Sequence, residues 1–355
     1  MAVAAVPVAR MPVMDTVRSA SATPLRSSDL ASSSPSSSSA PAVPPASAWI
    51  AWAAVSVIWG TTYLAIKVAL ETIPPFLISG LRYVIAGGAL LLWLKATGRP
   101  IPLRSTWPRL AAMGLLMLTV GNGAVSWGEQ YLASGLTAVV IATTPFWMVA
   151  IDALMPGGSK LSGRQALGLF IGFAGILALV WPELSLSGGA MVLAGVAALE
   201  LACVGWAIGS GLSRRQGVSS GVLGTAALQM LFAGVMLLVI ATALGEWTAL
   251  AFSPRSAAAL GYLILAGSLV AFAAYSHALR HLPVAVVSLH SYVNPVIALA
   301  LGALLLGEPF RLSMLIAGGA ILTGILIVRK TTGTTGTTGT AGTRSALSRG
   351  RFVRK

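Results

Sequence analysis

The sequence has very little charge and almost no cysteine. Charged residues make up 9% of the 355 residues, against 56% hydrophobic residues and a mean hydropathy of +0.85. Soluble domains carry about 25% charged residues, so this composition excludes a soluble globular protein and indicates an all-α, polytopic membrane protein. Cys203 is the single cysteine, which excludes a disulfide framework and a cysteine metal site.

Two further absences narrow the function. The sequence has no Gly-x-x-x-x-Gly-Lys-[Ser/Thr] loop for ATP. Its formal charge of +14 comes from basic residues between hydrophobic runs and in the tails, without a basic stripe that alternates with aromatics, so nucleic acid is not an expected partner. We expect no metal, no cofactor and no catalytic residue. The expected partners are a small-molecule substrate and the lipid bilayer, and the sequence leaves the oligomeric state open.

Composition divides the chain into four parts. Residues 1–46 form a Ser- and Pro-rich tail that we expect to be disordered, with an organelle transit peptide as the alternative. Residues 47–181 and 188–330 form two hydrophobic halves, and residues 331–355 form a disordered basic tail. Runs long enough to cross a bilayer as helices of roughly 20 residues are expected at 48–70, 75–94, 109–128, 132–154, 164–181, 188–211, 221–244, 257–279, 284–306 and 312–329.

The distribution of basic residues predicts the orientation. If the N-terminus is cytoplasmic, all but four of the 23 Lys and Arg residues lie on the cytoplasmic side. Arg255 and Arg311 lie on the outer side, and Lys67 and Arg82 lie within or at the ends of spans. Cytoplasmic loops carry an excess of Lys and Arg, so both termini are expected in the cytoplasm.

The two halves repeat one another weakly. At an offset of 147 residues, Trp59 and Gly87 coincide with Trp206 and Gly234, and further along an offset of 150 places Pro145 on Pro295. Each unit has five spans, which is an odd number. The second unit therefore enters the membrane from the side opposite to the first. Such inverted repeats supply the geometry of alternating access.

Each half also carries one proline inside an apolar run. A proline there removes a backbone donor and clashes with the preceding turn, so we expect a kinked or broken helix at Pro145 and at Pro295. Broken helices at mid-depth are where membrane transporters form binding sites.

Four stretches in order resemble the EamA-type drug/metabolite transporter superfamily. They begin at Trp59-Gly-Thr-Thr-Tyr, Leu81-Arg-Tyr-Val, Gly121-Asn-Gly-Ala and Ser291-Tyr-Val-Asn-Pro, the last with Leu306-Gly-Glu following. The resemblance covers about 48–330. It implies ten helices in two inverted halves around a central cavity, secondary transport, and export of amino acids, related metabolites or drugs.

Three charged residues are candidates for coupling. Glu200 lies near the middle of the sixth run, where an isolated carboxylate is suited to carry a proton; the alternative is a protonated Glu bonded to a neighbouring helix. Lys67 ends the first run and, with Arg82, is placed to bridge a substrate carboxylate, although snorkelling to the headgroups explains Lys67 equally well. Glu129 ends the third run on a face shared with Asn122.

Polar and aromatic side chains within the runs are candidates for lining the cavity. Their alternative roles are interhelical hydrogen bonding, kink stabilisation and interface anchoring. The candidates are Trp59, Thr62, Arg82, Asn122, Trp127, Gln130, Thr144, Trp206, His290, Tyr292 and Asn294.

These features predict a secondary transporter that exports amino acids or related small metabolites by alternating access, with a proton as the candidate coupling ion. An importer or exchanger of sugar-phosphates or nucleotide-sugars is the first alternative, and it requires several basic residues in the cavity. A membrane-embedded enzyme is the second alternative. The abundance of Arg, Ala and Gly favours a bacterial inner (plasma) membrane.

Overall fold

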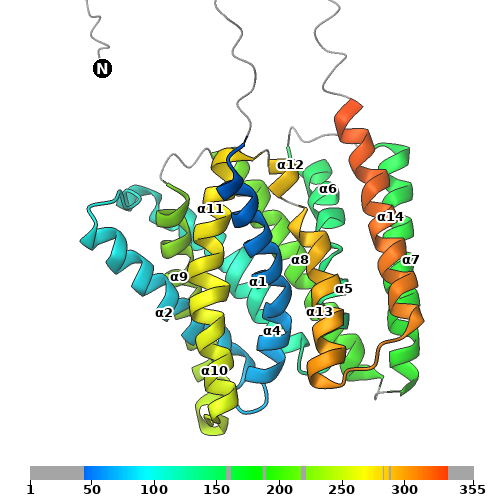
Figure 1. Cartoon of the computed structure of the whole chain (residues 1–355), viewed down its shortest axis with the longest axis horizontal. Helices are drawn as coiled ribbons and strands as arrows, with labels where there is room; N and C mark the ends of the chain where they lie inside the picture. Colours follow the sequence, from blue (N-terminus) through cyan, green and yellow to red (C-terminus); the bar gives the residue numbers. More distant parts are fainter. Residues whose placement is uncertain are drawn as a thin grey trace, which may run out of the picture. The chain divides into compact units, whose positions relative to one another are not determined.

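In a computed structural model, the described residues are 44–156, 161–186, 189–216, 221–282, 284–287 and 289–334, and they contain helices and no strand. The predictions for 1–43 and 335–355 lie outside these residues. The helices are α1 (Ala46–Ala69), α2 (Pro75–Ala96), η1 (Arg104–Thr106), α3 (Trp107–Gly114), η2 (Leu115–Asn122), α4 (Gly123–Gly128), α5 (Ser134–Ile141), α6 (Thr144–Leu154), α7 (Gly163–Leu186), α8 (Ala190–Gln216), α9 (Val222–Ala243), η3 (Glu246–Ala249), α10 (Pro254–Tyr262), η4 (Leu263–Val270), α11 (Ala271–His281), α12 (Val284–Val287), α13 (His290–Leu306) and α14 (Leu312–Thr334) (Figure 1).

Each of the ten expected spans falls on one or more of these helices. Within the described residues, seven continuous helical segments are long and apolar enough to cross a membrane, and two further apolar helices are shorter. The all-α membrane fold is therefore confirmed, whereas the number of ten spans stays a prediction.

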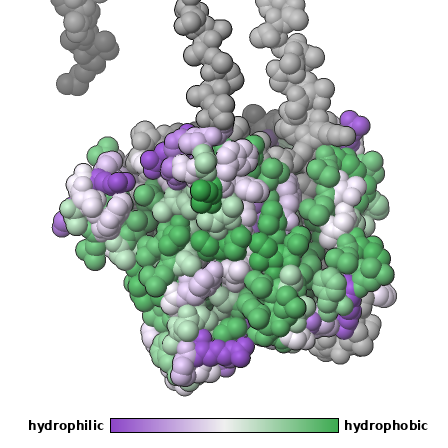
Figure 2. Space-filling view, viewed as in Figure 1, coloured by the Kyte–Doolittle hydropathy of each residue, from purple (hydrophilic) through white to green (hydrophobic). Residues whose placement is uncertain are grey.

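The surface of the helical bundle is apolar. Large hydrophobic side chains are exposed on several helices, among them Leu92 at 70%, Phe170 at 73% and Leu304 at 79%. In Figure 2, hydrophobic residues cover the middle of the visible face, and hydrophilic residues gather towards its two ends. A water-soluble protein rarely exposes apolar patches of this extent. The chain is a multi-pass membrane protein.

Helices from one half pack against helices from the other. α2 packs on α9, α7 on α14, α1 on α11 and α13, and α8 on η2, α4 and α6. Small residues permit the closest of these contacts: a Cβ atom at Gly87 would lie 2.8 Å from the carbonyl oxygen of Ala227, and one at Gly234 would lie 2.6 Å from the backbone nitrogen of Val84. Gly87 on α2 and Gly234 on α9 thus allow their helices to meet backbone to backbone.

Two π-helical segments interrupt the third and eighth expected spans. η2 begins at Leu115 and η4 begins at Leu263, 148 residues later, and each continues directly into an α-helix. The sequence did not predict them. π-helical turns widen the helix and are frequent at functional sites.

The two prolines behave differently from one another. α5 ends at Ile141 and α6 begins at Thr144 with proline in its first turn, so the interruption falls directly before Pro145. Pro295 instead lies inside α13, which begins at His290. A kink at Pro295 stays a prediction. α14 extends to Thr334, beyond the expected start of the C-terminal tail at 331.

Candidate functional site

Arg82 lies buried where α2 meets the π-helix η4, with 5% of its surface exposed. Its Nε donates to Ser268 Oγ at 2.8 Å, and its Nη2 donates to the carbonyl oxygen of Gly267 at 3.3 Å. Within the described part of the chain, no carboxylate lies within ion-pair distance of this guanidinium. A buried cation with spare donors and no anionic partner is suited to bind the carboxylate of a ligand.

Trp59 joins this arginine to an aromatic cluster. Its Nε1 donates to the same Gly267 carbonyl oxygen at 3.2 Å. Its ring packs against Phe272, Tyr275 and His290 at centroid distances of 5.6, 5.3 and 4.9 Å. The cluster therefore joins α1 from the first half to α11 and α13 from the second.

The α13 candidates serve mainly to hold α13 against its neighbours. His290 Nδ1 donates to the carbonyl oxygen of Val287 at 2.8 Å, which leaves Nε2 as an acceptor in the neutral ring. The Asn294 amide, oriented to donate, reaches the carbonyl oxygens of His290 at 2.8 Å and Ser56 at 3.1 Å. Tyr292 packs against the main hydrophobic core. Asn294 thus ties the first turns of α13 to α1.

Glu200 lies on α8 and faces the interruption between α5 and α6. Trp147 Nε1 donates to its Oε2 at 2.5 Å, and Thr143 Oγ1 approaches both carboxylate oxygens at 3.4 Å. Thr144 Oγ1 donates to the carbonyl oxygen of Ile141 at 2.7 Å and contacts Cys203 Sγ at 3.3 Å. The Glu200 carboxylate on α8 is thus bound by donors on α6 and on the residue directly before it.

Thr62 lies beside Arg82: a Cβ atom at Gly267 would lie 3.1 Å from Thr62 Cγ2 and 3.2 Å from Arg82 Nη2. The Thr62 hydroxyl donates to the carbonyl oxygen of Trp59 on its own helix at 2.7 Å. Trp206 packs against the cluster that contains Leu118. The rings of Trp127 and Tyr131 pack edge to face at a centroid distance of 5.1 Å. The backbone of Asn122 accepts a long bond from Ser79, and Gln130 is exposed and lines a cleft beside Lys67.

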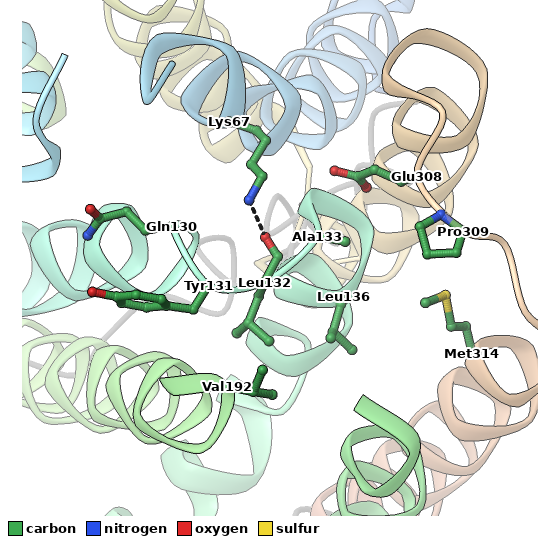
Figure 3. A pocket seen from close by; sticks show the side chains of 10 residues that line it. All are labelled: Lys67, Gln130, Tyr131, Leu132, Ala133, Leu136, Val192, Glu308, Pro309 and Met314. Atoms are coloured by element: carbon green, nitrogen blue, oxygen red, sulfur yellow. Dashed lines mark hydrogen bonds between the residues drawn. The ribbon is translucent and has the colours of Figure 1, made fainter. Parts of the chain in front are cut away.

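A third polar group lies at the end of the bundle where α1, α5 and α13 meet. Lys67 on α1 donates to the carbonyl oxygens of Glu129 and Leu132 at 2.7 Å each, and Figure 3 shows the bond to Leu132. The Glu308 carboxylate accepts from the backbone nitrogen of Ser134 at 2.8 Å and from that of Gly135 at 3.2 Å, and so caps the N-terminus of α5. A cleft of about 300 Å³ opens between these elements.

The carboxylate of Glu129 is buried beside this group. Glu129 directly follows the span Arg104–Gly128, its exposed fraction is 0%, and neither of its carboxylate oxygens has a hydrogen-bond partner among the described residues. Burial raises the pKa of Glu129 well above its usual value, while the charge of Lys67 lowers it in part and that of Glu308 raises it further.

The structure gives different partners to residues that the sequence placed together. Lys67 donates to the connection between α4 and α5, whereas Arg82 donates to η4, and a substrate carboxylate bridged by both stays a prediction. Of the two residues at the end of the third span, Glu129 is buried and Gln130 is exposed. Within the described residues, no group of three His, Cys, Asp or Glu side chains is placed to hold a metal ion.

Sequence reasoning missed several contributors. Ser268 and Gly267 bind Arg82 through the π-helix, and nothing in an apolar run containing Gly-Ser marks such a role. Tyr63 lies within electrostatic range of Glu129 and Cys203. Its position four residues before Lys67 places both on one helical face, a signal that was available in the sequence.

The model of the EamA-like transporter family matches this chain twice, over residues 47–181 and 193–330. The chain belongs to this family. Family membership and the apolar helices together make it a membrane transporter, as the resemblance of its four stretches predicted.

Relatives from distant organisms agree with this assignment. The uncharacterized inner membrane transporter YedA of Escherichia coli (strain K12) is 35% identical over 276 residues, which covers 78% of this chain and 88% of YedA. The WAT1-related protein At3g02690, chloroplastic, of Arabidopsis thaliana is 27% identical, over 78% of this chain and 67% of its own. A protein crystal structure aligns with a TM-score of 0.58 at 21% identity, over 81% of this chain and 99% of its own, and so supports the fold.

Proposed function

We propose that this transporter exports amino acids or closely related small metabolites by secondary, alternating-access transport. The observation that carries the proposal is the buried guanidinium of Arg82, which has no anionic partner among the described residues and lies at the contact between the halves. Its Nη groups retain donors for a substrate carboxylate. The adjacent Trp59 ring offers an apolar surface for the rest of the molecule.

The packing of the two halves supports the alternating-access part of the proposal. Corresponding helices meet across the bundle, as in the pairs α2–α9 and α7–α14. At the α2–α9 contact, Gly87 and Gly234 each face the backbone of the other helix, so the two corresponding helices pack at the closest distance their backbones permit. An inverted repeat of five spans per half is the arrangement that this pairing favours.

We further propose that both termini are cytoplasmic and that the membrane is the bacterial inner membrane. The excess of Lys and Arg on one side supports this orientation. Fusion of a reporter that is active only outside the cytoplasm to the C-terminus tests it, and activity of the reporter there contradicts it.

The decisive experiment is uptake into proteoliposomes. A panel of radiolabelled amino acids, with sugar-phosphates as the competing class, is offered with and without a pH gradient. We expect uptake of one or more amino acids and a loss of at least about tenfold for Arg82→Met, since a charge-assisted bond is worth about 1.5–3 kcal/mol. Arg82→Lys is the matched variant that retains the charge without the planar fork.

Two outcomes contradict the proposal. Uptake of sugar-phosphates alone would reassign the substrate class. Equal amino acid uptake by the native protein and by Arg82→Met would remove Arg82 from the site. The same assay on Glu200→Gln shows whether the mid-depth carboxylate takes part in proton coupling.

A further inference from the structure

The carboxylate of Glu129 is the one buried charged group in the described residues whose oxygens both lack a hydrogen-bond partner. Leaving a carboxylate in this state is costly, because an ionised group without donors loses its hydration and gains nothing in return. An unsatisfied buried group of this kind commonly has a functional role, such as the binding of an ion. The groups around Glu129 indicate which ligand could bind to its carboxylate oxygens.

The surroundings favour a proton over a metal cation. Lys67 lies close enough to act on Glu129 electrostatically but gives its hydrogen bonds to the carbonyl oxygens of Glu129 and Leu132. A metal ion would be repelled by that ammonium, and it would require several oxygen ligands. Glu308, the second carboxylate nearby, already accepts bonds from Ser134 and Gly135. A proton requires one oxygen atom and very little space.

The charged and titratable groups around Glu129 come from two directions. α1 contributes Lys67 and Tyr63, and the residues after α13 contribute Glu308. α8 and α2 also pack on α4, but their contacting residues, such as Gly195, Leu199 and Ser79, do not titrate. Lys67 is therefore the charge that opposes protonation of Glu129, and burial is what favours it.

We propose that Glu129 is an occluded proton-binding site whose access is controlled by Lys67. In the conformation described here Lys67 holds the connection between α4 and α5 through two carbonyl oxygens, and the carboxylate is closed off. When these two bonds break, the cleft between α1, α5 and α13 reaches the carboxylate. One proton then binds to a carboxylate oxygen from the outer side, and it is released to the cytoplasm as substrate moves outwards. This last step rests on the proposed export function.

The test measures proton binding directly and needs no substrate. The full chain is placed in lipid nanodiscs, and infrared difference spectra are recorded while the pH is changed. We expect a carboxylic acid C=O band that titrates in the native protein, disappears in Glu129→Gln and persists in Glu200→Gln and Glu308→Gln. A band that survives in Glu129→Gln, or that is lost in Glu200→Gln instead, overturns the assignment.

Two matched variants, Lys67→Met and Lys67→Arg, test the role of Lys67. Lys67→Met removes the positive charge, so the midpoint of the titrating band is expected to move to higher pH by about one unit or more. Lys67→Arg retains the charge and is expected to leave the midpoint near the native value. An unchanged midpoint in Lys67→Met contradicts the proposed control by Lys67.

Failure to fold is recognised separately. Elution on size exclusion and the combined emission of the ten tryptophans, which include Trp127 beside Tyr131 next to the site, report the native structure. If Glu129→Gln does not fold, Glu129→Asp replaces it, since a shorter carboxylate must still titrate but at a shifted midpoint. A confirmed proton band without amino acid uptake would leave this site standing and refute only the proposed export function.

Discussion

Glu200 and Glu129 are two carboxylates enclosed by the same helical bundle, and their surroundings are opposite. Glu200 accepts a short bond from the indole of Trp147 and two longer contacts from Thr143. Glu129 is more deeply buried and accepts none among the described residues. The first is bound like a structural acceptor, whereas the second has the unfilled bonding capacity that a ligand site requires.

The comparison teaches that depth in a hydrophobic run is a poor guide to function. Glu200 lies in the middle of α8, so the sequence favoured it for coupling, whereas Glu129 follows the end of a span. In the folded protein the number of donors around each group distinguishes them better than their depth does. The predictions below test whether this distinction holds, beginning with the largest expected effect.

Removal of the indole donor tests the partnered carboxylate. Trp147→Phe keeps an aromatic ring beside Phe173 but leaves Glu200 without its shortest bond. Because the acceptor is a charged group, we expect a loss of about 2 kcal/mol, measured as a lower melting temperature in micelles. Trp181→Phe on α7 is the control, since Trp181 is 67% exposed and should change stability by less than about 0.5 kcal/mol. Equal effects of the two changes would mean that the Glu200 bond contributes nothing.

Neutralising each carboxylate should give opposite results. The pKa of Glu129 is raised by burial, so the folded protein holds this proton more tightly than the unfolded chain does. Native stability therefore falls as the pH rises from the ordinary carboxyl pKa towards the raised one, and Glu129→Gln lacks this contribution. We expect Glu129→Gln to be more stable than the native protein by about 1 kcal/mol at about pH 8, with the difference shrinking as the pH falls towards 5.

Glu200→Gln is the matched change at the partnered site. It weakens a charge-assisted bond to the Trp147 indole, so a lower melting temperature at about pH 8 is expected, by about 1 kcal/mol. Thermal unfolding of both variants in the same micelle, from acid to alkaline pH, gives the comparison. Stabilisation by both variants, or by neither, contradicts the distinction between the two sites.

Much of the helical fold was predictable, because helix formation in a membrane follows from local hydrophobicity and length. All ten expected runs fall on helices. The π-helical segments η2 and η4 were not predictable, since their backbone pattern depends on packing against the opposite half. The two prolines show the same limit, since the local sequence does not distinguish Pro145 in the first turn of α6 from Pro295 inside α13.

The candidate site was predictable as a set of residue types and not as an arrangement. Arg82 and Trp59 were identified from their positions in apolar runs, and in the fold they share the Gly267 carbonyl oxygen. The state of Glu129 required the structure, because no sequence pattern reveals whether donors surround a carboxylate. A residue's own identity gives its bonding capacity, and only its neighbours determine how much of that capacity is used.

The smallest expected effects come from two threonines that repeat the comparison in uncharged form. Thr143 donates to the carbonyl oxygen of Val140 at 2.8 Å and approaches Glu200, whereas the hydroxyl of Thr137 on α5 is fully buried and has no partner among the described residues.

Valine has the same shape as threonine, so Thr143→Val should lose about 0.6 kcal/mol, a usual value for a hydrogen bond between membrane helices. Thr137→Val should leave stability unchanged or raise it, because it removes a buried hydroxyl that binds nothing. Thermal unfolding in one micelle and at one pH measures both. A greater loss from Thr137→Val than from Thr143→Val would show that partners visible in the fold do not determine which buried polar groups stabilise it, and the distinction between Glu200 and Glu129 would fail with it.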